Sequence, residues 1–377
     1  TQGTIREGQT VGVARSDDDI RQDKINQIFV YKGLKKTPVK EAKCGDIVVV
    51  SGISDISIGE TVTVMDDPQV MEMINIEEPT LSMNFMVNSS PFAGRSGKYV
   101  TTRNIKERLE KELEVNVGLK VEETQSTDSF KVSGRGELHL SILLENMRRE
   151  GYELAVSKPE VIMKNGENGR LLEPVEEVVI SVPDEYSGSV ISKLNLRKGL
   201  MNYMNSENGF TKLEYLVPTR GLLGYRSEFI NDTRGEGSMV RRFDSFEEYK
   251  GEIPQRNNGV AIAQEQGVAT PYALSNISER VKLFIEPGTE VYEGMIIGMN
   301  SRADDMVVNP TKAKKATNMR AAGNDDAVKL PPSKRFTLEE ALEFINDDEL
   351  VEIVPDDIRI RKKYLKELDR RRNRNNG

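Results

Sequence analysis

The feature that most constrains the fold of this chain is an order of strands and helices that occurs twice. Between residues 77 and 160, two stretches with a helical period lie among four strand-like stretches, in the order βαββαβ. The same order recurs between residues 161 and 246. In the first helical stretch Ile105, Leu109 and Leu113 recur every four positions, as on the buried face of an amphipathic helix. The order predicts two ferredoxin-like domains, each an antiparallel sheet with two helices on one face.

The segments on either side of this repeat are rich in strand-forming residues. Residues 1–76 contain short β-rich runs separated by glycines, so we expect a partial β-barrel that is incomplete at its start. Residues 247–377 begin with similar runs and continue into a predicted helix and strand within 337–355. We therefore predict a multidomain α+β protein. The expected domains are residues 1–76, residues 77–160, residues 161–246, and a mixed β-rich C-terminal domain at residues 247–377.

Composition excludes several kinds of site. Cys44 is the single cysteine and His139 the single histidine, so neither an internal disulfide nor a zinc site of Cys and His can form. His139 lies between two leucines and is interpreted as a packed or capping residue, and Cys44 as a small structural residue. No window holds 18 apolar residues and the N-terminus lacks a signal layout. We expect a cytoplasmic protein with no membrane partner.

Charge is distributed unevenly along the chain. The formal net charge is −8, but residues 309–377 hold 16 Lys and Arg against 13 Asp and Glu, which leaves −11 for residues 1–308. Residues 309–323, NPTKAKKATNMRAAG, here called the basic loop, contain no acidic residue and no apolar period. A long stretch of this kind is usually a binding loop or a mobile one.

We predict that the basic loop contacts RNA. Lys312, Lys314 and Lys315 carry compact charges suited to phosphates. Arg320 can form a bidentate pair, and Asn318 can hydrogen-bond to a sugar or a base edge. The alternative is that these lysines only keep a long loop soluble.

Two other basic features favour structural interpretations. Basic pairs precede Gly151 and Gly199 at the ends of predicted helices, where cations oppose the negative helix end and glycine adopts the left-handed cap. The basic tail, residues 359–374, is expected to be a solvated helix end, with non-specific RNA affinity as an additional prediction.

Two short motifs fail as nucleotide sites. Residues 94–98, GRSGK, resemble part of a phosphate loop, but Phe92 and Tyr99 stand where that motif needs Gly and Ser or Thr. Residues 232–235, DTRG, have no phosphate loop before them. We therefore predict no catalytic residue, metal ligand or cofactor site in residues 1–377.

Longer stretches resemble known translation factors. Residues 130–164, which include GRGELHLSILLENMRREG, are similar to the third domain of elongation factor G, and residues 173–201 are similar to its fifth domain. Only fifteen residues separate Lys158 from Glu173, which leaves no room for the fourth domain. Residues 291–323 and 337–363 resemble the C-terminal domain of the TypA/BipA translational GTPases.

The resemblance implies a ribosome-dependent GTPase of which this chain is the part without the GTPase domain. It implies that GTP and Mg²⁺ bind elsewhere in the intact protein, and that a monomer docks on ribosomal RNA and ribosomal proteins, with A-site tRNA as a further candidate. Family roles include ribosome assembly, stress response and virulence regulation. The alternative is a tandem ferredoxin-like module that senses small molecules, which would leave the basic loop unexplained.

Overall fold

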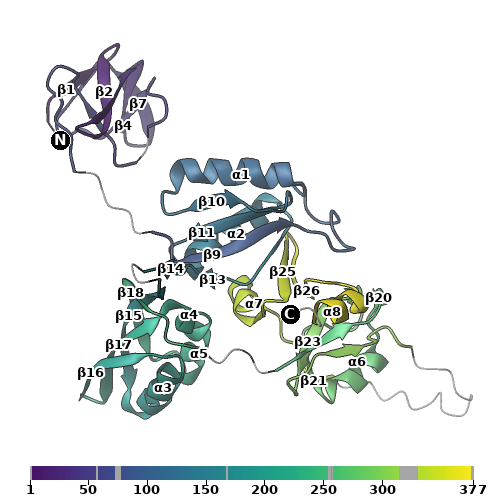
Figure 1. The fold of residues 1–377 in the computed structure, drawn as a ribbon. Helices are drawn as coiled ribbons and strands as arrows, with labels where there is room; N and C mark the ends of the chain where they lie inside the picture. Colours follow the sequence, from purple (N-terminus) through teal and green to yellow (C-terminus); the bar gives the residue numbers. More distant parts are fainter. Residues whose placement is uncertain are drawn as a thin grey trace, which may run out of the picture. The chain divides into compact units, whose positions relative to one another are not determined.

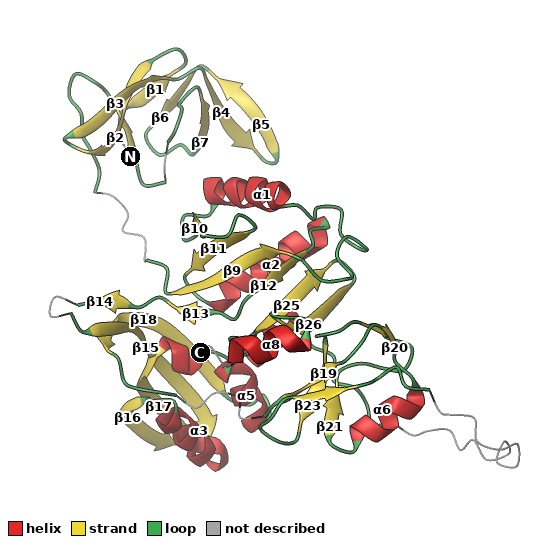
Figure 2. Ribbon diagram, turned by 45° about the vertical axis from the view of Figure 1, so that its right-hand side comes forward, coloured by secondary structure: helices red, strands yellow, loops and turns green. Residues whose placement is uncertain are grey.

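The computed structural model describes residues 2–56, 58–72, 78–166, 169–253, 256, 258–313 and 330–374. These residues form a mixed α and β architecture with several separate sheets (Figure 1; Figure 2). The chain divides into two compact units, Thr1–Glu77 and Glu78–Gly377. The division falls where the first βαββαβ stretch is predicted to begin. The predicted domains at residues 77–160, 161–246 and 247–377 thus share the second unit.

The first unit is built only from strands in its described residues. Its three small antiparallel sheets have the orders β1-β6, β3-β2-β8 and β5-β4-β7, and the described pairings do not join them into one closed barrel. Val11, Ile25, Ile28 and Ala42 form their common core. The strands are β1 (Thr4–Arg6), β2 (Thr10–Ser16), β3 (Asp19–Lys24), β4 (Gln27–Lys32), β5 (Lys35–Val39), β6 (Glu41–Lys43), β7 (Val48–Ser51) and β8 (Thr61–Thr63).

The second unit contains a seven-stranded sheet assembled from two distant parts of the chain. Strands of residues 81–161 lie in the order β10-β11-β9-β12, with β13 also beside β9, and β25 and β26 continue the sheet beyond β12. Every neighbouring pair is antiparallel. The elements are β9 (Leu81–Val87), α1 (Thr102–Val115), β10 (Lys120–Glu123), β11 (Ser129–Gly134), α2 (Glu137–Glu150), β12 (Leu154–Val156), β13 (Glu160–Val161), β25 (Glu349–Val354) and β26 (Asp357–Lys362).

Local sequence signals explain where the two helices begin and end. Thr101 and Asn104 form a capping box at the start of α1, which satisfies backbone N–H groups that the first turn leaves without partners. Gly151 ends α2 in the left-handed conformation, at φ 95°, as predicted. Ile105 and Leu109 of α1 and Leu144 of α2 are buried in the core under the sheet.

A second sheet follows, with strands in the order β18-β15-β17-β16. Asn208 and Gly209 join β16 to β17 with φ angles of 55° and 82°, as a two-residue type I′ turn requires. Val178, Leu213, Tyr215 and Tyr225 are fully buried between the sheet and its helices. The elements are β14 (Lys164–Asn165), β15 (Leu171–Pro183), α3 (Asp184–Leu196), β16 (Leu200–Glu207), β17 (Phe210–Pro218), α4 (Thr219–Leu222), α5 (Tyr225–Asp232) and β18 (Ser238–Glu248).

Two local predictions in this part are wrong. The sequence GLLGYRSEFIND, residues 221–232, predicts one helix as the second of this βαββαβ stretch, but the chain turns at Leu223 and at Gly224, whose φ is 72°, so that α4 and α5 are separate. After α3 the left-handed residue is Lys198, at φ 64°, and not Gly199. A Cβ at Gly199 would lie 2.9 Å from the carbonyl oxygen of Leu194, so glycine is needed there for close approach.

The remaining residues form a smaller β-rich part with its own core. Its main sheet has the order β21-β23-β19-β24, and α6 packs beside β21. Leu274, Val291, Tyr292 and Ile297 are buried in its core. The elements are β19 (Val260–Ala263), β20 (Gly267–Val268), α6 (Pro271–Ser278), β21 (Val281–Leu283), β22 (Glu290–Val291), β23 (Ile296–Asn300), β24 (Met306–Val308) and α8 (Glu367–Arg374). The helix α7 (Leu338–Phe344) packs instead on α2, with Leu338 and Leu342 in the core under the seven-stranded sheet.

The prediction of a solvated tail at residues 359–374 is wrong for its first part. These residues begin within β26, and Arg361 and Lys362 are each only 2% exposed. Both charges face buried carboxylates, because Arg361 Nε lies 3.0 Å from Glu352 and Lys362 Nζ lies 3.0 Å from Glu349. Burial removes the hydration of these cations, and the ion pairs with the carboxylates offset that cost in free energy. Only the later residues form the exposed helix α8.

Candidate nucleic-acid interface

The basic loop departs from the small β-rich part at a well-ordered anchor. Thr270 caps α6 with its side chain, and the same hydroxyl donates to the carbonyl of Lys312 at 2.7 Å. The side chains of Asn309 and Thr311 each donate to Glu265 at 2.7 Å. These hydrogen bonds lower the pKa of Glu265, Thr311 contributing most. The loop therefore begins at a fixed point on this core.

The chain returns from the basic loop to the same core. Leu330 packs against the cluster that contains Leu274 and Tyr292. The backbone N–H of Lys334 donates to Leu283 of β21 at 2.8 Å, and Arg335 pairs with Glu286 at 3.1 Å. Both ends of the segment between residues 313 and 330 are thus held by one small domain.

The structure locates one of the five predicted RNA-binding residues. The side chain of Lys312 is exposed, beside the anchor at Thr270. Lys314, Lys315, Asn318 and Arg320 lie outside the described residues, so their RNA contacts stay a prediction.

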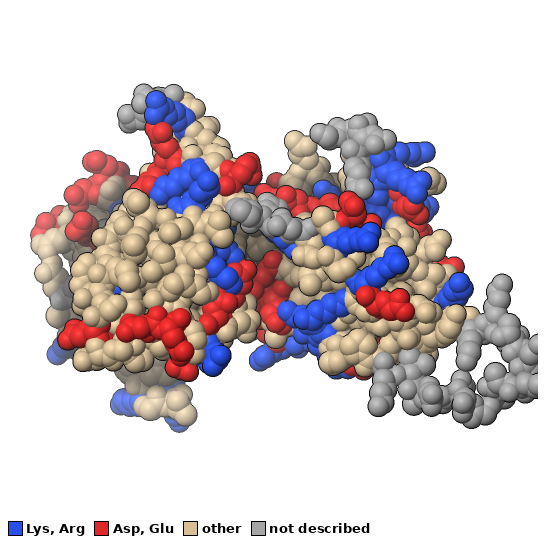
Figure 3. Space-filling view, turned by 90° about the horizontal axis from the view of Figure 1, so that it is seen from below, with Lys and Arg blue, Asp and Glu red and all other residues tan. Residues whose placement is uncertain are grey.

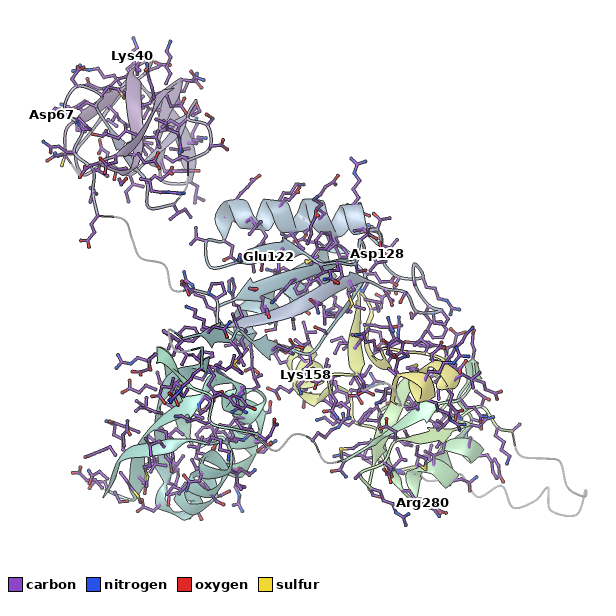
Figure 4. The ribbon with its side chains drawn as sticks, in the orientation of Figure 1. Lys40, Asp67, Glu122, Asp128, Lys158 and Arg280 are labelled. Carbon is purple, nitrogen blue, oxygen red and sulfur yellow. The ribbon has the colours of Figure 1, made fainter. Side chains whose placement is uncertain are left out.

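An additional basic surface, which the sequence reading missed, lies on the same small domain. Arg280, Lys282 and Arg302 are exposed, and within the described residues none of them has an ion-pair partner. The backbone N–H of Ser301 donates to the carbonyl of Arg280 at 3.0 Å, and Lys282 lies on β21 beside β23, so the three cations are neighbours. Figure 3 shows Lys and Arg gathered over this part, and Figure 4 labels Arg280 at its outer edge. Arg302 lies twenty residues after Lys282 in the chain, which hides the cluster from sequence reading.

The arginines before the helix-ending glycines pair with carboxylates and donate to backbone carbonyls of neighbouring segments. Arg148 pairs with Glu145 at 2.8 Å and donates to the carbonyl of Pro355 at 2.7 Å. Arg197 donates to the carbonyl of Gly221 at 2.8 Å. These contacts are structural, and they include Glu145 of the same helix for Arg148 and Glu228 of α5, at 3.0 Å, for Arg197.

The GRSGK segment is closed to phosphate by the protein itself. The carboxylate of Glu153, 1% exposed, accepts hydrogen bonds from the backbone N–H groups of Gly94 and Gly97 at 3.0 and 3.1 Å. The side chain of Asn88 donates a third at 2.9 Å. Backbone N–H groups that converge in this way commonly bind anions, and here the anion is an internal carboxylate.

Neither the single histidine nor the DTRG segment shows catalytic geometry. His139 Nδ1 accepts from the backbone N–H of Arg135 at 3.3 Å, and its Nε2 lies 2.8 Å from the side-chain nitrogen of Asn116. Burial, together with the nearby charge of Arg135, lowers the pKa of His139. Asp232 pairs with Lys193 at 2.7 Å on the neighbouring helix. These groups hold helices together.

A cleft of about 740 Å³ lies within the second unit, and its cations are already paired. Glu137, the first residue of α2, faces this cleft and accepts from the backbone N–H of Gly224 at 3.2 Å. Burial raises the pKa of Glu137 to about 7; the carboxylates of Glu343 and Glu176 add to this effect, and Arg241 opposes it. The paired cations are Lys158 with Asp347, Arg197 with Glu228, Arg220 with Glu173, Arg256 with Glu349 and Lys334 with Glu340.

The described residues provide neither a metal cluster nor a membrane-spanning helix. In the ranges that the structure describes, no group of three or more His, Cys, Asp and Glu side chains is placed to hold a metal ion. No helix among these residues has the length and apolar character needed to cross a membrane.

The fold and its sequence matches define a protein of the translation-factor class. Residues 1–63 match the family described as elongation factor Tu domain 2, and residues 170–257 match the elongation factor G C-terminus. Residues 258–367 match the TypA/BipA C-terminal domain. The chain belongs to the TypA/BipA family, which confirms the resemblance found in its sequence.

Three relatives that align with nearly the whole chain have the same name. Proteins called large ribosomal subunit assembly factor BipA from Bacillus subtilis and Haemophilus influenzae are 48% and 49% identical over 370 and 372 residues. The relative of that name from Escherichia coli is 48% identical over 372 residues. These alignments cover 98% of this chain and 60–61% of the relatives. The chain thus spans about three fifths of the length of these relatives.

Proposed function

We propose that this chain is the ribosome-docking part of a translational GTPase that acts in assembly of the large ribosomal subunit. The names of its relatives and its three matching domain families support this assignment. GTP and Mg²⁺ would bind to the part of such a protein that the chain does not span. We place the intact protein in the cytoplasm, with action under stress and in virulence regulation as further parts of the proposal.

We propose that the two βαββαβ stretches are ferredoxin-like domains corresponding to the third and fifth domains of elongation factor G. The strand orders β12-β9-β11-β10 and β18-β15-β17-β16 support this, because in both the fourth strand lies beside the first and the third lies between the first and the second. Residues 1–76 would correspond to the β-barrel second domain.

The observation that carries the RNA-binding role is the anchoring of the basic loop. The four cations of the basic loop lie in a segment whose two ends are fixed to one small domain, at Thr270 on one side and at Leu283 on the other. The part of that segment that follows the basic loop contains Asp325, Asp326 and Lys329. Such a loop can extend toward phosphates while losing less conformational freedom than a chain end would. Arg280, Lys282 and Arg302 add a basic surface on the same domain. Ribosomal RNA is the first partner that we propose, and tRNA the second.

Ribosome pelleting across a salt titration tests this proposal. We expect alanine at Lys312, Lys314, Lys315 and Arg320 in the intact protein to weaken ribosome association. If three or four phosphates are contacted, the slope of log affinity against log salt should fall by about 2–4. Intrinsic GTP hydrolysis should remain unchanged, because the loop belongs to a different domain.

A charge-matched variant provides the control. Alanine at Arg103, Lys106, Lys111 and Lys120 removes four exposed cations from α1 and β10 and should leave the salt slope as it is. Wild-type affinity of the loop variant at every salt concentration would show that the loop is only a solvated surface. A thermal shift with amino acids instead of ribosome binding would favour the small-molecule alternative.

A further inference from the structure

The described residues between 164 and 248, here called the second βαββαβ body, have a core of their own. Within the described parts of the chain, their sheet contains only the strands β14 to β18, and their core cluster contains only their own side chains. Leu223 packs against the core under the seven-stranded sheet, but it is not a member of that core. The C-terminal residues differ, because Val260 and Leu338 are members of it. The second βαββαβ body therefore touches the rest of its unit without sharing a core with it.

A polar contact at the first residue of α2 joins this body to the rest of the unit. The carboxylate of Glu137 accepts from the backbone N–H of Gly224 at 3.2 Å and lies 3.6 Å from Arg241. Ser227 donates to the carboxylate of Glu343 on α7. A Cβ added at Gly224 would lie 3.5 Å from Cβ of Glu343, so the two parts touch here. We call these five residues the Glu137 junction.

A cleft lies beside the Glu137 junction. It has a volume of about 740 Å³ and is lined from both sides, by Glu137 and Glu343 on one part and by Leu223 and Ser227 on the other. A body with its own core, joined through a small polar contact beside a cleft, has the arrangement of a domain that moves on a hinge.

The junction disfavours the ionised form of Glu137. Arg241, which opposes this effect, lies closer to Glu176, at 2.9 Å, than to Glu137. Burial raises the pKa of Glu137 to about 7, and the carboxylates of Glu343 and Glu176 act in the same direction. The charged groups that face Glu137 are Arg241 of β18, Glu176 of β15 and Glu343 of α7, and those that face Glu343 are Lys334, Glu340 and Glu228.

Separation of the two parts would favour the ionised form. Glu137 is the first residue of α2, and the preceding Gly136 supplies no side-chain cap. The N–H groups of a first helical turn are without intrahelical partners, and the helix dipole favours a negative charge beside them. A carboxylate that regains water at this place is therefore stable, and the two protonation states of Glu137 favour different arrangements.

We infer that the Glu137 junction is a proton-controlled contact, which holds the second βαββαβ body in place when Glu137 is neutral and releases it when Glu137 is ionised. This inference is independent of the proposed function. The contact should be strongest below pH 4.5 and should weaken as the pH rises through 7, because the attached state binds the proton more tightly than the separated state. For Glu137 alone, the equilibrium constant for attachment should fall roughly 50–100-fold between pH 5 and pH 8.

Pulsed electron–electron resonance between two spin labels on the 377-residue chain tests the inference. Cysteines replace Ser189 on α3 and Glu114 on α1, two exposed positions on the two parts, and the exposed Cys44 is changed to serine. We expect one distance at pH 5, and at pH 8 a second, broader population of distances. Glu137→Gln keeps a neutral side chain at the junction, so this variant should show the single distance at both pH values.

Two controls accompany this measurement. Glu160→Gln removes an exposed carboxyl that lines the same cleft outside the junction, and it should leave the pH response unchanged. Labels at Ser189 and Ser206, both within the second βαββαβ body, should give one distance at both pH values, because the body moves without unfolding. The inference would be overturned by a single distance at pH 8 in the original chain, by an equal pH response in Glu137→Gln, or by a pH-dependent distance within the body.

Discussion

At the scale of single residues, the buried carboxylate of Glu153 is the most constrained charge near the GRSGK segment. Glu153→Ala would leave the N–H groups of Gly94 and Gly97 and the amide of Asn88 without their acceptor. We expect a loss of about 3 kcal/mol in the free energy of unfolding, measured by urea denaturation with circular dichroism. Glu114→Ala, on the exposed side of α1, should cost less than about 0.5 kcal/mol. Equal effects of both changes would contradict the assigned role of Glu153.

The carboxyl group of Glu137 should make stability depend on pH. Its pKa is raised from the ordinary 4.5 to about 7, so the folded chain binds more protons than the unfolded chain between these values. Stability should therefore be highest below pH 4.5 for this group and fall by about 2–3 kcal/mol as the pH rises through 7.

Glu137→Gln should flatten that part of the pH dependence. The groups facing this carboxyl are Arg241 of β18, Glu176 of β15, Glu343 of α7 and the N–H of Gly224. Burial also raises the pKa of Glu343, so a smaller slope of the same sign should remain. The measurement is the melting temperature between pH 5 and pH 8. Identical slopes for the variant and the original chain would exclude Glu137 as the cause.

At the scale of elements, the order of strands and helices along the chain was predictable from the sequence. The pairing of strands that are distant in the sequence was not. Ile105 and Leu109 mark α1 by their spacing, and Asn208-Gly209 marks a hairpin by turn chemistry. No local pattern shows that Val156 pairs with Val351, because almost two hundred residues separate them. The prediction of a solvated tail was wrong for the same reason. Its charges look solvated in the sequence, because Glu349 and Glu352 come beside them only in the folded chain.

This correction changes what truncation at the C-terminus should do. Ending the chain after Ile358 removes most of β26 and leaves the buried carboxylate of Glu352 without Arg359 and Arg361, with the hydroxyl of Tyr292 as its remaining partner. We expect a loss of about 3–5 kcal/mol in stability, since breaking a buried ion pair leaves an uncompensated charge. Ending the chain after Lys366 removes only α8 and should preserve the melting temperature within a few degrees. Scanning calorimetry of the two truncated chains distinguishes these outcomes, and equal melting temperatures would mean that β26 contributes nothing.

At the scale of the whole molecule, the candidate site was only partly visible in the sequence. The basic loop was identifiable because its cations are contiguous and unaccompanied by acids. Its anchors were not, since Thr270 and Glu265 lie 42 and 44 residues before Lys312 and Asn309, the loop residues that they bind, and become relevant only through folding. Family resemblance identified the C-terminal part correctly, but gave no indication that this part completes the sheet of residues 81–161.

That shared sheet predicts which parts of the chain fold independently. Residues 78–377 form one compact unit, in which Val260, Ile262, Leu342 and Ile353 enter the core of the first βαββαβ stretch. A chain of residues 78–377 should therefore keep the main melting transition of the full chain. A chain of residues 78–250 would expose the edge of β12 and the apolar side chains that those residues cover, so it should aggregate or melt at least about 10 °C lower. Calorimetry and light scattering of both chains provide the measurement, and residues 1–72 alone serve as the control for independent folding. A stable, monomeric 78–250 chain with the original transition would show that the seven-stranded sheet adds little to the stability of the molecule.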